Sequence, residues 1–268
     1  MFLAIDVGNT QTTLGLLEGG EVRRRWRLKT DRNDTADELH ARLLSFLAVR
    51  GLALDAIEVA AIASVVPILT DMWRIALEDA LGSEPYVVRG SRDCCMSIDM
   101  PYPEQVGADR IANAVEARDT YGAPAIVVDF GTATNIDVVD GRGSYRGGCI
   151  APGLMLSASA LFAHAAKLAS TPIEVPPAAI GDTTEHAIQS GLVLGVAAQA
   201  EGLVARIKTQ LAAEAENAED KALALACPVV ATGGLSHVIS VATDVFDAID
   251  MDLTLRGVWR IWHLHHQE

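Results

Sequence analysis

The sequence opens on Phe2-Leu-Ala-Ile-Asp6-Val-Gly8-Asn-Thr10-Gln-Thr-Thr13 and continues into a second apolar run, Leu14 to Leu17. Two short apolar runs around a polar turn with Gly and Asn predict a β-hairpin. The carboxylate of Asp6 then lies at the end of a buried strand, where a charge must be paired or must face a cation. The backbone N–H groups of a Gly turn and Thr hydroxyls suit phosphate oxygens, and an Asp suits hydrated Mg²⁺. A turn capped by Asp6, with no ligand, is the alternative interpretation.

The pattern of this hairpin returns once, at Ala125-Ile-Val-Val-Asp129-Phe-Gly131-Thr132-Ala-Thr134. Each copy has four apolar residues, an Asp, an apolar residue, a Gly and then hydroxyl residues, and each continues into another apolar stretch. Internal similarity of this kind indicates a repeated structural unit. The repeat therefore predicts two related domains that face each other across a nucleotide.

Composition limits the classes of function that the chain can have. Half of the 268 residues are hydrophobic and 21% are charged, which is typical of a globular protein with a substantial core. The formal net charge of −14 argues against non-specific binding to nucleic acid and to anionic membranes, because both need Lys and Arg. The uncharged stretch 147–166 contains Pro152, three Gly and two Ser, so we expect no membrane span there. The four cysteines show no C-x-x-C spacing, and with no visible targeting segment they favour a reducing cytoplasm.

The order of apolar runs and breakers predicts an α/β architecture of stacked layers. The first half predicts a third antiparallel strand at 21–28, a helix at 36–49 capped by Asp34 or Thr35, a buried strand at 57–66, a helix at 68–81 and a strand from Tyr86. The second half predicts helices at 154–168 and 196–216, the latter with a solvated charged end at 214–221, and a strand at 228–232 ending on Gly233-Gly234. The histidine-rich tail, His263 to His266, is expected to be mobile.

Asp109 lies in the first turn of a predicted helix that reaches about Tyr121, after the rigid segment Met100-Pro-Tyr102-Pro103. An N-terminal cap, or a carboxylate matched to the helix dipole, is one interpretation. A carboxylate aimed into a cleft beside the cation of Arg110 is the other. On either interpretation, the helix N-terminus and Arg110 are expected to lower the pKa of Asp109.

Five motifs in one order carry a specific resemblance. They are Asp6-Val-Gly-Asn-Thr10, Gly107-Ala-Asp-Arg110, Asp129-Phe-Gly-Thr-Ala-Thr134, Gly147-Gly148 with Pro152-Gly153, and Thr232-Gly233-Gly234. Together they resemble type III pantothenate kinases, within the actin/Hsp70/sugar-kinase superfamily. The resemblance spans roughly residues 2 to 258, including Ser64-Val-Val-Pro67 and Leu253-Thr-Leu-Arg-Gly257. It departs at Asn135, where the family often has Thr.

The resemblance implies a fold of two ribonuclease-H-like (actin-like ATPase) domains, each a mixed five-stranded sheet with flanking helices. The expected domains are 1–117, with the first hairpin and the Asp109 helix, and 118–268, with the second hairpin, the Gly233-Gly234 motif and the dimer helices. It further implies ATP-dependent phosphorylation of pantothenate to 4′-phosphopantothenate, the first step of coenzyme A biosynthesis, by a cytoplasmic homodimer.

The resemblance also implies roles for individual residues. Asp109 is the implied general base, Asp129 the ligand of a monovalent cation (K⁺ or NH₄⁺), and Asp6 a ligand of Mg²⁺ through water. The implied ATP-binding residues are Asp6, Val7, Gly8, Asn9, Thr10, Gln11, Thr12, Thr13 and Thr132. The implied pantothenate site consists of Tyr102, Gly107, Ala108, Asp109, Arg110 and Thr184.

Two other functions remain open on the sequence. Another small-molecule kinase of the superfamily is the nearer one, although no cysteine-rich zinc motif, Walker A or G-x-G-x-x-G is present. The second is a regulatory protein like the Bvg accessory factors, which the family also resembles. A regulator that binds DNA directly should have a basic recognition surface, which a net charge of −14 disfavours.

Overall fold

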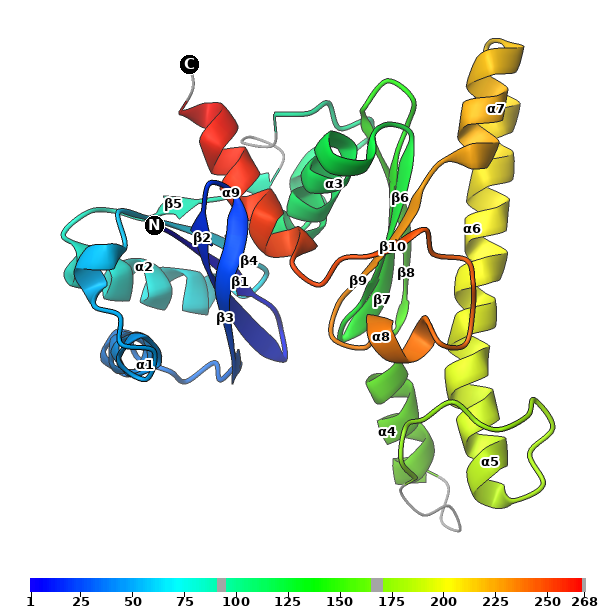
Figure 1. Ribbon diagram of the computed structural model, residues 1–268, viewed down its shortest axis with the longest axis horizontal. Coiled ribbons are helices and arrows are strands. Elements are labelled where there is room, and N and C mark those ends of the chain that lie inside the picture. The colour runs from blue at the N-terminus through cyan, green and yellow to red at the C-terminus, as the bar shows by residue number, and fades with distance from the viewer. Residues whose placement is uncertain (91–94, 165–170, 267–268) are drawn as a thin grey trace. The chain divides into compact units, whose positions relative to one another are not determined.

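The computed structural model describes residues 1–90, 95–164 and 171–266. Its contacts divide the chain into two compact units, coloured along the chain in Figure 1. The first unit comprises Met1–Glu116 and Asp252–Glu268, and the second comprises Ala117–Met251. Each unit is built on its own sheet.

The first unit contains a five-stranded sheet in the order β3-β2-β1-β4-β5. Its strands are β1 (Phe2–Val7), β2 (Gln11–Glu18), β3 (Glu21–Lys29), β4 (Val59–Ser64) and β5 (Tyr86–Val87). Strands β1, β2 and β3 form an antiparallel meander, whereas β4 pairs parallel with β1 and β5 parallel with β4. The turn between β1 and β2 therefore lies at the same edge of the sheet as the end of β4.

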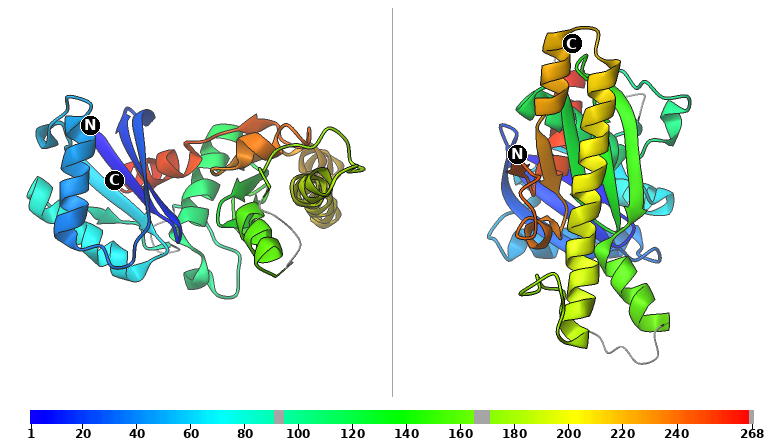
Figure 2. Two further views of the ribbon diagram at one scale, coloured as in Figure 1. Left: turned by 90° about the horizontal axis from the view of Figure 1, so that it is seen from below. Right: turned by 90° about the vertical axis from the view of Figure 1, so that its right-hand side faces the viewer.

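Helices cover both faces of this first sheet (Figures 1 and 2). The helices of this unit are α1 (Ala36–Ala48), α2 (Pro67–Leu81), α3 (Ala108–Tyr121), which continues into the second unit, and α9 (Leu253–His265), with short 3-10 turns at Leu54–Ala56 and Pro103–Gln105. Thr35 caps α1 in a capping box with Glu38, and left-handed Gly82 ends α2. Helices α1 and α2 bury Leu43 and Trp73 on one face, and α9 packs on the other.

The second unit repeats this topology. Its sheet has the order β10-β9-β6-β7-β8. The strands are β6 (Ala125–Phe130), β7 (Ala133–Val139), β8 (Tyr145–Pro152), β9 (Val229–Thr232) and β10 (Ala248–Ile249). Read from its other edge, it matches the first sheet strand for strand, with the same antiparallel and parallel pairings. Strands β1 and β6 also share one burial pattern, with a half-buried Asp between buried residues. The predicted fold class, two mixed five-stranded sheets with flanking helices, is confirmed.

The helices of the second unit are α4 (Leu154–His164), α5 (Thr184–Gln189), a π-helical turn (Ser190–Leu194), α6 (Gly195–Glu214), α7 (Ala218–Ala226) and α8 (Ser236–Ile239). In the part of the chain that the structure describes, Thr184–Glu214 is the one helix whose length and composition would let it cross a membrane. Its residues Val196, Ala200 and Val204 belong to the core of the second unit. Buried core helices have such a composition too, so it is weak evidence for a span.

Three sequence expectations differ from the structure. Helix α6 ends at Glu214 and a new helix begins, because Asn217 accepts a hydrogen bond from the N–H of Asp220 at 2.9 Å and caps α7. The tail is helical to His265, and the rings of His265 and His266 contact that of Tyr86 on β5, so the expectation of a mobile tail was wrong. Helix α9 also packs on the first sheet, although the predicted second domain, 118–268, included it. The predicted helix at 154–168 begins as expected, and its end lies outside the described residues.

Candidate active site

The first candidate element is the turn Gly8–Gln11 between β1 and β2. The N–H of Gly8 donates to the carbonyl of Gln11 at 3.1 Å and closes the turn. Asp6 is half-buried and pairs in register with Thr13, so both side chains lie on the face of the sheet that α9 covers. A carboxylate at this strand end can act on a ligand at the turn.

The remaining predicted ATP-binding residues of this hairpin fall into two sets. Asn9, Thr10 and Gln11 are exposed at the tip of the turn. Val7 and Thr12 are buried, and they face the core that α1 and α2 cover. The side chains of Val7 and Thr12 therefore support the turn from inside the core.

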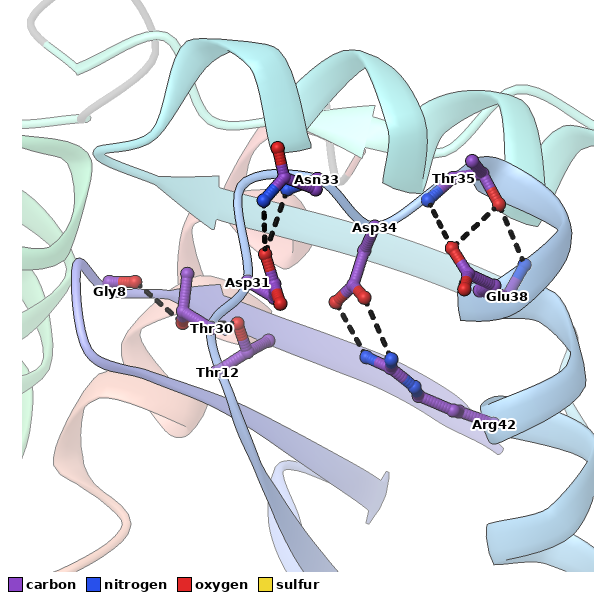
Figure 3. Close-up of polar contacts among 9 residues, drawn as sticks. All are labelled: Gly8, Thr12, Thr30, Asp31, Asn33, Asp34, Thr35, Glu38 and Arg42. Carbon is purple, nitrogen blue, oxygen red and sulfur yellow. Dashed lines mark hydrogen bonds and ion pairs between the residues drawn. The ribbon is translucent and has the colours of Figure 1, made fainter.

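Thr30, which the sequence did not indicate as a site residue, holds the turn by hydrogen bonds (Figure 3). It follows directly on β3. Its N–H donates to the carbonyl of Thr10 at 3.0 Å, and its hydroxyl donates to the carbonyl of Gly8 at 2.8 Å. The hydroxyl of Thr12 lies 2.9 Å from that of Thr30. The register of β2 with β3, which pairs Gln11 with Lys29, is the signal that places Thr30 beside the turn.

The segment between β3 and α1 is itself anchored, as Figure 3 shows. Asp31 accepts hydrogen bonds from the backbone and side chain of Asn33, both at 3.0 Å. The buried carboxylate of Asp34 binds the guanidinium of Arg42 through two contacts, at 2.5 and 2.7 Å. The bond to Asp34 raises the pKa of Arg42. Such a bidentate pair fixes both partners in orientation, so the segment carrying Thr30 is held at its far end by α1.

Asp109 occupies the first turn of α3, and its carboxylate curls back over the helix start. Its Oδ1 accepts a hydrogen bond from the N–H of Arg110 at 2.8 Å. A Cβ on Gly107 would lie 2.5 Å from this oxygen and 3.3 Å from a methyl of Val65, so the carboxylate needs a glycine there. The N–H of Val65 donates to the carbonyl of Val7 at 3.1 Å. Asp109 therefore lies by the same strand ends that carry the first hairpin.

The electrostatics of Asp109 differ from the expectation. Burial raises the pKa of its carboxyl, while the N–H and the charge of Arg110 act to lower it, and burial wins. The expectation of a lowered pKa was wrong because it counted the helix start and Arg110 but not the surrounding protein. A carboxylate with a raised pKa is a stronger base than an ordinary Asp side chain.

The second hairpin gathers three of the sequence motifs within the second unit. The N–H of Gly131 donates to the carbonyl of Ala133 at 3.0 Å, and the carbonyl of Thr132 accepts the N–H of Gly153 at 3.1 Å. A Cβ on Gly233 would lie 2.3 Å from Oδ1 of Asp129. Gly233 thus lies against the half-buried carboxylate of Asp129, and the Pro152-Gly153 motif lies against the turn of the same hairpin.

The other predicted site residues lie on different parts of the chain. Tyr102 is exposed just before the 3-10 turn Pro103–Gln105, and Ala108 and Arg110 belong to the first turn of α3. Thr184 is the exposed first residue of α5, behind the cap Thr183, whose hydroxyl accepts the N–H of His186 at 3.0 Å. Within residues 1–90, 95–164 and 171–266, no group of three or more His, Cys, Asp or Glu side chains could hold a metal ion. A divalent ion on Asp6 would need water or phosphate as further ligands.

Comparison with known proteins gives consistent matches. A family model described as type III pantothenate kinase matches residues 2–206. A protein named type III pantothenate kinase from Thermomicrobium roseum is 41% identical over 267 residues, which are 100% of this chain and 98% of that protein. One of the same name from Rubrobacter xylanophilus is 42% identical over 266 residues, or 99% and 98%. A solved structure described as a Baf family transcriptional activator from Campylobacter jejuni has a TM-score of 0.62 at 16% identity, over 99% of this chain and 100% of that one, which shows the fold alone.

Proposed function

The chain belongs to the type III pantothenate kinase family, and we propose that its two acidic hairpins and Asp109 are the machinery of that reaction. The protein phosphorylates pantothenate in coenzyme A biosynthesis, with ATP as co-substrate. The observation that carries the proposed site is the repeat of one hairpin, with a half-buried Asp at the same position, in two sheets of one topology.

The hairpin turns bind the phosphates of ATP. In the first turn, the exposed residues Asn9, Thr10 and Gln11 offer backbone N–H groups and polar side chains, which suit phosphate oxygens. Asp6 and Thr13 lie beside them on one face. In the second turn, Thr132 is exposed and offers a hydroxyl that suits phosphate oxygens.

Cations complete the site. Phosphoryl transfer passes through a loose transition state, so charge neutralisation and positioning dominate catalysis. Mg²⁺, held through water by Asp6, would neutralise phosphate charge when bound. Asp129 would bind a monovalent cation, K⁺ or NH₄⁺, and its carboxylate already lies in a space that any side chain at position 233 would fill. The half-buried carboxylates of Asp6 and Asp129, at the same position of two matching strands, fit both roles.

Asp109 orients the primary hydroxyl of pantothenate and accepts its proton. Oδ1 is held by the N–H of Arg110, so we assign proton acceptance to Oδ2. Its raised pKa suits a base, and general-base catalysis contributes on the order of 10²–10⁴-fold. Tyr102, Gly107, Ala108, Arg110 and Thr184 form the rest of the pantothenate site, with Arg110 as the cation for the pantothenate carboxylate.

A cytoplasmic homodimer that binds neither nucleic acid nor membrane is the working assembly. Its support is the net charge of −14 and the exposed apolar side chains Met155, Leu156, Leu223 and Leu225 on helices α4 and α7, which suit a second copy. The fold shared with a Baf family protein does not favour a regulatory role, since a fold alone implies no function.

Replacing Asp109 by Asn tests the proposed base. Asp109→Asn keeps the size of the side chain and loses its charge, so kcat should fall by at least about tenfold while ATP binding is largely kept. The exposed Asp71 on α2 provides the control, and Asp71→Asn should leave both quantities unchanged. Turnover and calorimetric binding of a non-hydrolysable ATP analogue are the two measurements. Near wild-type turnover in Asp109→Asn would refute the assignment.

A further inference from the structure

We propose that Thr30 is a positioning residue for ATP: it holds the carbonyl oxygens of Gly8 and Thr10, in the first hairpin turn, away from the bound phosphates. The inference rests on the proposed function of this turn as a phosphate-binding element. Thr30 lies outside the hairpin itself, and it acts through Gly8 and Thr10 without touching the nucleotide.

Thr30 binds two carbonyls of the turn, and Figure 3 shows its bond to the carbonyl of Gly8. Its hydroxyl donates to the carbonyl of Gly8 at 2.8 Å, and its N–H donates to the carbonyl of Thr10 at 3.0 Å. The carbonyl of Gln11 is taken within the turn by the N–H of Gly8, at 3.1 Å. All three oxygens are therefore directed toward donors of the protein.

The direction of these carbonyls determines what the turn presents to an anion. A trans peptide unit is planar, and its N–H points opposite to its C=O. Thr30 holds the carbonyl of Gly8, so the N–H of Asn9, in the same peptide unit, points away from Thr30. Thr30 also holds the carbonyl of Thr10, so the N–H of Gln11 points away from Thr30 too. Successive N–H groups on one side form a site for an anion, whereas a carbonyl oxygen turned to that side would repel phosphate.

The order of the protons assigns separate roles to Thr30 and Thr12. A threonine hydroxyl has one proton, and that of Thr30 goes to the carbonyl of Gly8. The 2.9 Å contact between the two hydroxyls is then a bond that Thr12 donates and Thr30 accepts. Thr12 is buried and orients Thr30, and Thr30 in turn fixes the backbone of the turn.

The second hairpin shows that the hydroxyl is a specific feature of the first. Gly153 follows β8 as Thr30 follows β3, and its N–H likewise donates to a turn carbonyl, that of Thr132, at 3.1 Å. A Cβ on Gly153 would lie 2.6 Å from the carbonyl oxygen of Gly131, so this position cannot carry a side chain. The first hairpin thus has a side-chain hydroxyl on the carbonyl of Gly8, whereas the second has a glycine beside the equivalent carbonyl, that of Gly131.

Steady-state kinetics of position 30 variants test the proposal. Thr30→Val keeps the backbone N–H and the size of the side chain but loses the hydroxyl, and we expect KM for ATP to rise about fivefold or more. The KM for pantothenate should change less than about twofold, since a backbone shift in this turn acts on the nucleotide. Thr30→Ser keeps the hydroxyl and should stay within about twofold of wild type for both substrates.

A matched control and a second variant complete the test. Thr70 on α2 donates its hydroxyl to the carbonyl of Val66 at 3.2 Å, away from the hairpin, and Thr70→Val should leave both KM values unchanged. Thr30→Ala loses the same hydroxyl without a methyl against Gly8, so it replaces Thr30→Val if that protein does not fold. An unchanged KM for ATP in the folded variant, or an equal rise for pantothenate, would overturn the proposal. Wild-type protein without pantothenate-dependent turnover would instead contradict the proposed function.

Discussion

At Asp109, two opposing effects act on one carboxylate. The N–H and charge of Arg110 favour the ionised form, while burial disfavours it, and the net result is a raised pKa. The ionised form that the proposed base needs is therefore less stable inside the protein than it is in water. This is the usual cost of a catalytic group held in a partly desolvated site.

The raised pKa predicts that Asp109→Asn stabilises the protein. A carboxyl whose folded-state pKa exceeds the ordinary value contributes stability at low pH, and this contribution is lost as pH rises through the folded pKa. At neutral pH the neutral amide should therefore raise Tm by about 1–3 °C. Thermal denaturation at a series of pH values is the measurement.

The gain in Tm should disappear as the pH is lowered through the raised pKa, because the wild-type carboxyl then becomes neutral too. Asp71→Asn, on the exposed side of α2, serves as the control and should leave Tm unchanged at each pH. A lower Tm for Asp109→Asn at neutral pH would mean that the charge stabilises the fold, contrary to the argument from burial.

At the scale of secondary-structure elements, helix α9 packs closely against α3, the helix that carries Asp109. Gly257 lets the two helices approach closely, since a Cβ there would lie 2.0 Å from the carbonyl oxygen of Ala112. The hydroxyl of Thr254 donates to the side chain of Asn113 at 2.8 Å. The buried carboxylate of Glu116 binds Arg260 at 2.6 Å and Arg256 at 3.2 Å. Helix α3 is thus fixed by the C-terminal helix.

This close packing of α9 on α3 predicts that two glycine-to-alanine substitutions change the free energy of unfolding in opposite directions. Gly257→Ala must push α9 away from α3 and should lower the free energy of unfolding by about 1–3 kcal/mol, with a drop in kcat because Asp109 moves with its helix. Gly202→Ala, in the middle of α6 with open space around it, should be neutral or stabilising by up to about 1 kcal/mol. Urea denaturation measures the free energy of unfolding of both variants, and a turnover assay measures kcat. Equal stabilities of the two variants would contradict the close packing of α9 on α3.

The sequence predicted elements where local pattern and packing agree. The runs that end on Asp6 and Asp129 read as strands because apolar residues, a carboxylate and a Gly turn follow one another within a few positions. The break between α6 and α7 was missed because Asn217 lies in a run of good helix formers. The residues on both sides favour a continuous helix, so the sequence does not single out Asn217 as a cap. Thr30 was missed because its role depends on strand register, which only the folded sheet defines.

At the scale of the whole molecule, the chain contains two units with the same sheet topology. Both sheets have the same strand order and directions, and each ends its central antiparallel pair in an acidic turn. The repeat was visible in the sequence because the hairpin motif is short and contiguous. The residue that follows the third strand and contacts the turn differs between the units. It is Thr30, with a hydroxyl on the turn carbonyl of Gly8, in the first unit and Gly153 in the second.

The central claim is that this repeated acidic hairpin serves the transfer of phosphate from ATP to pantothenate. A coupled assay of ADP release, with and without pantothenate and in K⁺ and in Na⁺, tests it most directly. The account predicts ADP release that requires pantothenate and is faster in K⁺, because Asp129 binds a monovalent cation. ADP release that is indifferent to pantothenate but driven by a hexose would contradict it.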